Sequence, residues 1–175
     1  MMRVLVGIGF ALALAACGEP AAPAHDTPLA ETPAGPSVVV GIKTADAAAW
    51  AKYAPWKSDL PEVMKTGTGL ECVALASGPE GGAPPKANEQ AEVFYEGRLN
   101  AGGPAFDSAY ERNETATFPV DAVVDGFSEA LQLMKPGDHR ICFLPYRLAY
   151  GEEGKGPIPP KSDLLFEIEL VSVQP

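Results

Sequence analysis

The sequence is poor in the residue types that build metal sites and nucleophilic sites. Its 175 residues contain three cysteines and two histidines, and no CxxC pair, which argues against a zinc site. Neither His25 nor His139 has the neighbours that a catalytic triad requires. Gly102 and Gly103 lack the following Lys and Ser or Thr of a phosphate-binding loop. We therefore expect no metal, no cofactor and no covalent nucleophile.

Positive charge is also scarce. Thirteen Lys and Arg stand against 23 Asp and Glu, which gives a net charge of −10, and no run of basic residues occurs. The sequence therefore predicts no nucleic-acid partner and no attachment to anionic lipid headgroups by charge alone. Apolar residues make up 46% and charged residues 21% of the chain, a composition typical of a globular protein with a core. The length suits one domain plus a further segment at one end.

The longest apolar run, residues 4–16, is shorter than the roughly 20 residues that span a bilayer as a helix. It follows Met-Met-Arg and ends in small residues, the layout of a secretory signal. Leu14 to Cys17, with the sequence LAAC, resemble the lipobox of bacterial lipoproteins, in which the cysteine becomes the lipidated N-terminus. We predict a signal peptide over 1–16 and a palmitate-type lipid anchor on Cys17. The alternative is an ordinary signal peptide cut near Ala16.

The residues after Cys17 predict a tether. Five Pro and five Ala occur among residues 18–37, without an apolar face, and such segments stay extended. Gly18 stands where an Asp would favour the inner membrane, so the outer membrane facing the periplasm is the expected location. We divide the chain into the signal peptide, a lipidated tether over 17–37, an N-terminal extension over 38–65 and one domain over 66–175.

The body of the chain indicates an antiparallel sheet. Eighteen Gly and 18 Pro predict many turns and little long helix, and short alternating apolar runs favour antiparallel strands over βαβ units. Helical spacing over 123–134, ended by Lys-Pro-Gly, predicts one prominent helix. The predicted strands cover residues 38–42, 70–76, 91–99, 105–107 with 116–119, 138–144 and 164–173.

A second helix is predicted within residues 44–56, which carry Trp50, Tyr53 and Trp56. Two interpretations are open: these aromatic side chains form a surface for a partner or for dimerisation, or they pack on the domain that follows. The strand at 138–144 is apolar on both faces, so something must cover its outer face. Our hypothesis is that the aromatic segment lies there.

Seven short motifs follow one another along residues 66–175: VFYEGRL at 93–99, AFDSAYERN at 105–113, ATFPV at 116–120, VVDGFSEALQLMKPGD at 123–138, LAYG at 148–151, IPP at 158–160 and LLFEIELVSV at 164–173. The order and spacing of these motifs resemble those of FKBP-type peptidyl-prolyl isomerases. The resemblance implies an α+β fold, a five- to six-stranded antiparallel half-barrel wrapped around one short helix. It also implies an aromatic pocket that receives a substrate proline.

The resemblance assigns roles to ten residues around that pocket. The implied catalytic residues are Tyr95, Phe106, Asp107, Val124, Tyr150 and Phe166. The implied substrate-binding residues are Val123, Phe127, Ile158 and Arg112. In the family, Asp107 and Arg112 correspond to an ion pair, and the Val124 N–H and the Tyr150 hydroxyl donate to peptide carbonyls. Phe127 stands where many members have Trp, which implies a wider or shallower pocket.

The function implied is acceleration of X-Pro isomerisation in exported proteins at the periplasmic face of a membrane. The expected partners are unfolded or partly folded polypeptides that contain proline, together with the membrane through Cys17. The alternative is a tethered peptide-binding or assembly module with the same fold and negligible catalysis, which Phe127 keeps open.

The remaining cysteines lie on strands that the resemblance makes neighbours. Cys72 and Cys142 fall on the implied first and fourth strands of the sheet. An exported protein meets an oxidising compartment, so a cross-strand disulfide is one interpretation. Two buried thiols are the other, since free cysteine behaves as a small apolar residue.

Overall fold

The computed structural model describes residues 43–175. The predicted signal peptide, the lipid anchor at Cys17, the tether and the strand at 38–42 lie outside the described residues. The elements in chain order are α1 (Ala47–Tyr53), β1 (Met64–Lys65), β2 (Glu71–Ala76), β3 (Gln90–Leu99), β4 (Asp107–Ser108), α2 (Ala109–Arg112), β5 (Ala116–Pro119), the 3-10 helix η1 (Val120–Ala122), α3 (Asp125–Gln132), β6 (His139–Leu144), the 3-10 helix η2 (Tyr146–Leu148) and β7 (Leu164–Gln174).

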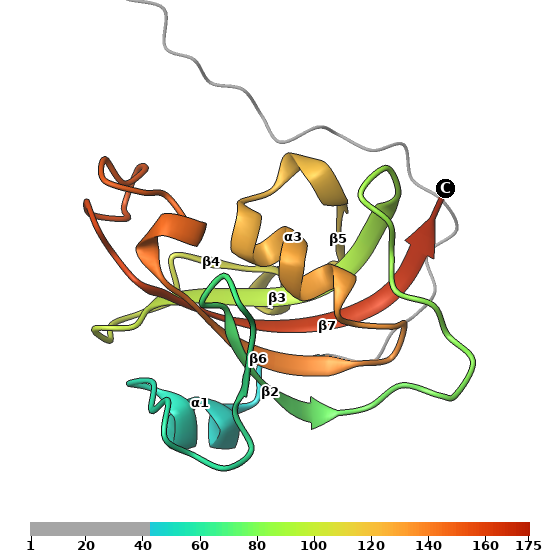
Figure 1. The fold of residues 1–175 in the computed structure, drawn as a ribbon, viewed down its shortest axis with the longest axis horizontal. Helices are drawn as coiled ribbons and strands as arrows, with labels where there is room; N and C mark the ends of the chain where they lie inside the picture. Colours follow the sequence, from blue (N-terminus) through green and yellow to red (C-terminus); the bar gives the residue numbers. More distant parts are fainter. Residues whose placement is uncertain (1–42) are drawn as a thin grey trace, which may run out of the picture. The chain divides into compact units, whose positions relative to one another are not determined.

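The strands form one antiparallel sheet in the order β1-β2-β6-β7-β3-β4, with β5 also paired to β3. Helix α3 lies against one face of this sheet and α1 lies against the other (Figure 1). This confirms the predicted α+β half-barrel around one main helix. The sheet has seven strands where five to six were expected. Residues 105–107 and 116–119 were counted as one strand, whereas β4 and β5 are separate, and the two-residue strand β1 is too short to produce an alternating pattern.

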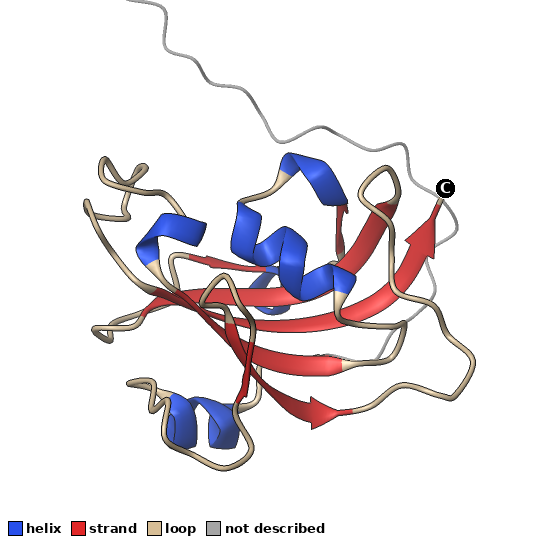
Figure 2. Cartoon of the chain, viewed as in Figure 1, coloured by secondary structure: helices blue, strands red, loops and turns tan. Residues whose placement is uncertain are grey.

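The long strands β3 and β7 lie side by side in the sheet (Figure 2). Most of their side chains are buried on both faces. On the face toward α3 they contribute to the main core, together with Phe127, Ala130 and Leu131 of the helix. On the opposite face, Glu96 of β3 stands directly across from Glu167 of β7. Both side chains are buried, and like charges at this position repel, so each carboxylate depends on the partners that surround it.

Helix α3 is shorter than the predicted range of 123–134, because Val123 and Val124 have extended backbone conformations. The helix starts when the N–H groups of Phe127 and Ser128 donate to the carbonyl of Val124, at 2.9 and 3.0 Å. It ends at Gln132, two residues before the predicted end, and the N–H of Leu133 donates to the carbonyl of Ala130 at 3.1 Å. The two valines therefore stand at the helix entrance rather than within its first turn.

Helix α1 covers the outer face of β6, as hypothesised. Asp46 caps the helix by accepting from the N–H groups of Ala48 and Ala49, at 2.9 and 3.0 Å. Trp50 and Tyr53 are buried in a second cluster that includes Val73, Ile141 and Leu165. The ring of Trp56 stacks on Phe143 with centroids 6.0 Å apart. These side chains pack on the domain that follows them, which is the second of the two interpretations of the aromatic segment.

Cys72 and Cys142 are joined by a disulfide in this structure. The two residues are direct cross-strand partners in β2 and β6, and both side chains lie in the main core. The bridge connects residues that are 70 positions apart in the sequence. It therefore ties β2, which has only the two-residue strand β1 on its outer side, to β6.

Within residues 43–175, helices long and apolar enough to cross a bilayer do not occur. The same part of the chain contains no group of three or more His, Cys, Asp or Glu side chains placed to hold a metal ion.

Candidate active site

Five aromatic side chains from five parts of the fold meet between the sheet and α3, and we call them the aromatic cluster. They are Tyr95 of β3, Phe106 before β4, Phe118 of β5, Phe127 of α3 and Phe166 of β7. Phe127 lies at the centre, with its ring centroid 5.2 Å from Phe166 and 6.0 Å from Tyr95, both edge to face. Phe106 meets Phe166 edge to face at 5.7 Å. Such edge contacts fix each ring relative to the next.

Gly97 makes room for two of these rings. It lies across from Phe166 in the β3–β7 ladder, and its carbonyl accepts from the N–H of Phe106 at 2.9 Å. A Cβ at this position would lie 2.5 Å from Phe106 Cζ and 2.6 Å from Phe166 Cε1. The rings occupy the space that any side chain here would fill.

A polar group of three residues borders the cluster. The Tyr95 hydroxyl donates a short hydrogen bond to Asp107. Arg112 donates to Asp107 Oδ1 at 2.7 Å and to the Tyr95 hydroxyl at 3.3 Å. Burial raises the pKa of Tyr95 to about 12, and the Asp107 carboxylate adds to that rise. The hydrogen bond to Asp107 raises the pKa of Arg112, so Arg112 is a permanent cation beside the cluster.

The raised pKa of Tyr95 predicts a loss of stability at alkaline pH. A tyrosine in the unfolded chain ionises near pH 10, whereas Tyr95 in the fold holds its proton up to about pH 12. The stability that the protonated Tyr95 hydroxyl contributes to the fold is therefore fully present below about pH 10 and is lost as the pH rises through about 12. Urea unfolding as a function of pH measures the decline, and Tyr95→Phe is expected to make it shallower. An equally steep decline in Tyr95→Phe would contradict the assignment, since Tyr110, whose pKa burial also raises, would then account for it.

Two hydrogen-bond donors at the edge of the cluster have no partner among residues 43–175. One is the backbone N–H of Val124 at the entrance of α3. The other is the hydroxyl of Tyr150, which is half buried. Burial and the charge of Asp107 raise the pKa of Tyr150, so this hydroxyl keeps its proton. Both donors are available to a ligand that brings carbonyl oxygens.

The segment after Tyr150 is fixed by its own hydrogen bonds. Gly154 N–H donates to the Tyr150 carbonyl at 3.1 Å, and Lys155 and Ile158 exchange two backbone hydrogen bonds of 3.0 Å. Ile158 is buried against the main core, and the ammonium of Lys155 lies 5.9 Å from the centre of the Tyr150 ring. The loop thus holds Tyr150 from its C-terminal side.

Within residues 43–175, apolar aromatic rings thus lie beside two donors that have no partner, an arrangement that suits a ligand with an apolar ring and carbonyl oxygens. Comparison with known proteins identifies the family. Residues 81–171 match the sequence profile described as FKBP-type peptidyl-prolyl cis-trans isomerase. The chain belongs to this family.

The similarity extends to named relatives and to a solved structure. The chain is 43% identical over 115 residues to the peptidyl-prolyl cis-trans isomerase Mip of Coxiella burnetii, covering 65% of this chain and 49% of that protein. It is 43% identical over 119 residues to the macrophage infectivity potentiator of Trypanosoma cruzi, covering 67% and 60%. A solved peptidyl-prolyl cis-trans isomerase from Pseudomonas syringae matches with a TM-score of 0.61 and 36% identity, covering 67% of this chain and 85% of that one. The chain spans about half of the length of the Mip protein that it matches.

The FKBP-type domain brings most of the predicted site residues together. Four of them, Tyr95, Phe106, Phe127 and Phe166, form the aromatic cluster with Phe118, and Asp107 pairs with Arg112. The others, Val123, Val124, Tyr150 and Ile158, pack against the same core. Their roles toward a substrate remain predictions.

Phe118 is a member of the cluster that the sequence interpretation did not include in the site. Its ring lies 5.6 Å from Tyr95 and 6.3 Å from Phe127. The ATFPV motif that contains Phe118 was part of the resemblance, but the resemblance gave this residue no role in the site. Alternation along a four-residue strand does not say which face is inward until the pairing of Phe118 with Ala91 in β3 is known.

Proposed function

We propose that this FKBP-type protein accelerates cis-trans isomerisation of X-Pro bonds in exported polypeptides at the periplasmic face of a membrane. The observation that carries the proposal is the aromatic cluster beside two unpaired donors, the Val124 N–H and the Tyr150 hydroxyl. The exposed edge of the cluster suits the apolar ring of a proline. The two donors suit the carbonyl groups of the peptide on either side of it.

Isomerisation needs only this kind of site. The barrier of roughly 18–20 kcal/mol comes from the resonance of the peptide bond, and an unaided X-Pro bond takes tens to hundreds of seconds to isomerise. Because no bond to the protein forms, the rate increases when the site binds the twisted amide more tightly than the planar one. Burying the amide against Phe106 and Phe166 removes water from its polar planar form, and the donors fix the peptide while the bond rotates.

The proposed location rests on the N-terminal sequence. A signal peptide over 1–16 would direct export, Cys17 would carry the lipid, and the residues up to 37 would separate the domain from the membrane. Clients at that location would be unfolded or partly folded chains that contain proline. The disulfide between Cys72 and Cys142 is compatible with an oxidising compartment.

Replacing Tyr150 or Phe106 tests the proposed function. In a protease-coupled assay on a proline peptide, we expect Tyr150→Phe to lower kcat/KM about tenfold, because one hydrogen bond is lost. Phe106→Ala is expected to lower it further, because the ring that covers the proline is removed. The assay uses the full chain extracted in detergent and the Cys17→Ser chain, which should need no detergent if Cys17 is the lipid anchor.

The outcome separates the two candidate functions. Acceleration that both substitutions lower, in variants with an unchanged circular dichroism spectrum, supports an isomerase at this site. A folded wild type that gives no acceleration rejects catalysis. In that case the fold serves as a tethered peptide-binding module, the interpretation that Phe127 in place of the more usual Trp keeps open.

A further inference from the structure

Helix α2 joins the proposed site to the N-terminal part of the described chain. It has only four residues, Ala109–Arg112, too few for a helix to be stable by its own hydrogen bonds. Its last residue, Arg112, holds Asp107 at 2.7 Å beside Tyr95. The position of this cation therefore depends on whatever fixes the two ends of the helix.

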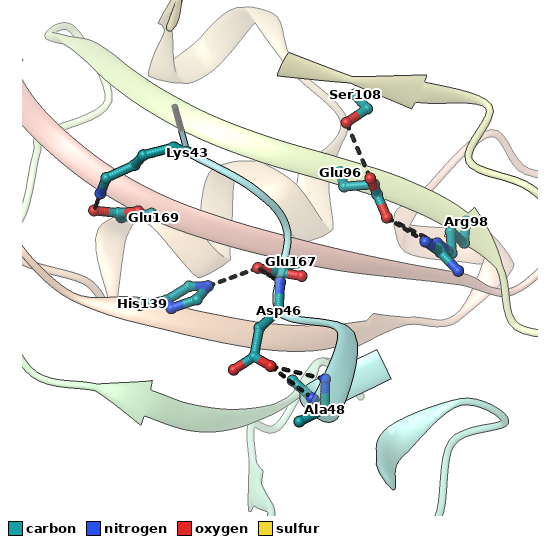
Figure 3. Close-up of polar contacts among 10 residues, drawn as sticks. Lys43, Asp46, Ala48, Glu96, Arg98, Ser108, His139, Glu167 and Glu169 are labelled. Atoms are coloured by element: carbon teal, nitrogen blue, oxygen red, sulfur yellow. Dashed lines mark hydrogen bonds and ion pairs between the residues drawn. The ribbon is translucent and has the colours of Figure 1, made fainter. Parts of the chain in front are cut away.

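The N-terminal end of α2 is held by a buried carboxylate. The Ser108 hydroxyl caps the helix by accepting from the Glu111 N–H at 3.1 Å. The same hydroxyl donates to Glu96 Oε2 at 3.0 Å (Figure 3). Ser108 and Glu96 are each only 3% exposed, so water does not replace this bond. Glu96 thus orients the capping hydroxyl.

Glu96 is in turn linked, through Arg98 of its own strand, to the N-terminal segment of residues 43–56, which we call the strap. Its other oxygen, Oε1, accepts from Arg98 Nε at 2.8 Å and forms an ion pair with Arg98 Nη2 at 2.7 Å. The Arg98 guanidinium lies 4.5 Å from the ring centre of Trp50 in α1, a cation–π contact. Because Glu167 stands directly opposite, the positive charge of Arg98 offsets the repulsion between the two carboxylates.

The strap also contacts the C-terminal end of α2. Asn113 ends the helix in a left-handed conformation with φ of 52°, and its Oδ1 accepts from the backbone N–H of Lys43 at 3.2 Å. The Lys43 ammonium forms an ion pair with Glu169 (Figure 3) and lies 5.6 Å from the ring centre of Phe94, which stacks on Tyr110 of α2. The strap is therefore connected to both ends of the helix that carries Arg112.

We propose that the strap, acting through Glu96, positions α2 so that Arg112 stays against Asp107 and Tyr95. Glu96 is a positioning residue, since it lies on the sheet face opposite the aromatic cluster and acts through Ser108 and α2. The consequence for catalysis rests on the proposed isomerase function. The consequence for the order of helix α2 does not rest on that function, so the effect on the helix and the effect on catalysis can be tested separately.

Glu96→Gln tests the catalytic consequence, because it keeps the shape of the side chain and removes the charge that pairs with Arg98. We expect kcat/KM to fall about fivefold in the full chain extracted in detergent. In an Arg112→Ala background the same change should have no further effect, because Glu96 acts only through Arg112.

The matched control is Glu71→Gln. Glu71 also contacts the strap, accepting from Trp56 Nε1 at 2.7 Å, but it lies on β2 away from α2, so kcat/KM should not change. Equal losses in the Glu96→Gln and Glu71→Gln variants, or an undiminished loss in the Arg112→Ala background, would overturn the proposal.

Hydrogen exchange tests the helix without any activity. The Glu111, Asn113 and Glu114 amides are bonded within or beside α2, and we expect them to exchange faster in Glu96→Gln while the amides of β6 and β7 keep their protection. Asn113→Gly gives a second variant, because glycine tolerates the left-handed conformation and removes only the acceptor for Lys43. Unchanged exchange of these amides in both variants would reject the inference even if the wild type is an active isomerase. Faster exchange in these variants, together with a wild type that gives no acceleration, would support the inference about the helix and reject the proposed function.

Discussion

Gly97→Ala is expected to lower the kcat/KM of the proposed isomerase about a hundredfold, the loss that a displacement of about 1 Å can cause at an active site. The added methyl group would lie within 2.5–2.6 Å of Phe106 and Phe166, so both rings must move. They cannot move inward, because the ring centroids of Phe127 and Phe166 are only 5.2 Å apart and the interior is close-packed. Overpacking of this kind also destabilises a protein by about 1–3 kcal/mol.

The measurement compares activity and unfolding in Gly97→Ala with those in Gly67→Ala. A methyl group at Gly67 meets no atom within 4 Å, so this control changes glycine to alanine without touching the cluster, and its activity should equal that of the wild type. Full activity in a folded Gly97→Ala variant would mean that the rings of Phe106 and Phe166 do not form the binding surface.

The aromatic cluster shows what the sequence could and could not predict. The motif order placed Tyr95, Phe106, Phe127 and Phe166 at one site, because each motif matches one element of a known fold. No motif could give the edge contacts between the rings or the space at Gly97, since these depend on the register of β3 with β4 and β7. A register is fixed by long-range pairing and not by the residues of one strand.

On the sheet face that α1 covers, too, the sequence predicted some features and could not predict others. The aromatic spacing in residues 44–56 and the two apolar faces of β6 predicted that the aromatic segment would cover the outer face of β6, and the two do pack together. Helix α2 was not predicted, although Ser108 followed by Glu111 is a capping signal, because four residues carry too little periodicity. The bonds of Glu96 to Ser108 and Arg98 could not be predicted, because buried charge in the middle of a strand contradicts the pattern that identifies strands.

Reducing the disulfide between Cys72 and Cys142 is expected to lower the free energy of unfolding by about 4 kcal/mol, the chain-entropy value for a loop of this length. The bridge spans 70 positions, so its removal frees a large part of the unfolded chain. In the folded state the two thiols would still fill the same space. The reduced wild type therefore loses only the stability that the covalent bridge provides and keeps the stability that the packing of the side chains provides. In contrast, the double variant Cys72→Ala/Cys142→Ala also leaves a cavity between side chains that are now 1% and 0% exposed.

The experiment uses urea unfolding in a Cys17→Ser background, which removes the lipid if Cys17 carries one and removes a third thiol if it does not. Tryptophan fluorescence reports on the transition, because Trp56 stacks on Phe143 of β6, the strand that holds Cys142. We expect the oxidised protein to unfold at the highest urea concentration, the reduced protein at a lower one and the double alanine variant at the lowest. The same midpoint with and without reductant, or two free thiols in the unreduced unfolded chain, would show that the cysteines stabilise the sheet only by packing. Because β2 pairs with β6 on one side and only with the two-residue strand β1 on the other, a chain that loses the bridge should open first at β1 and β2.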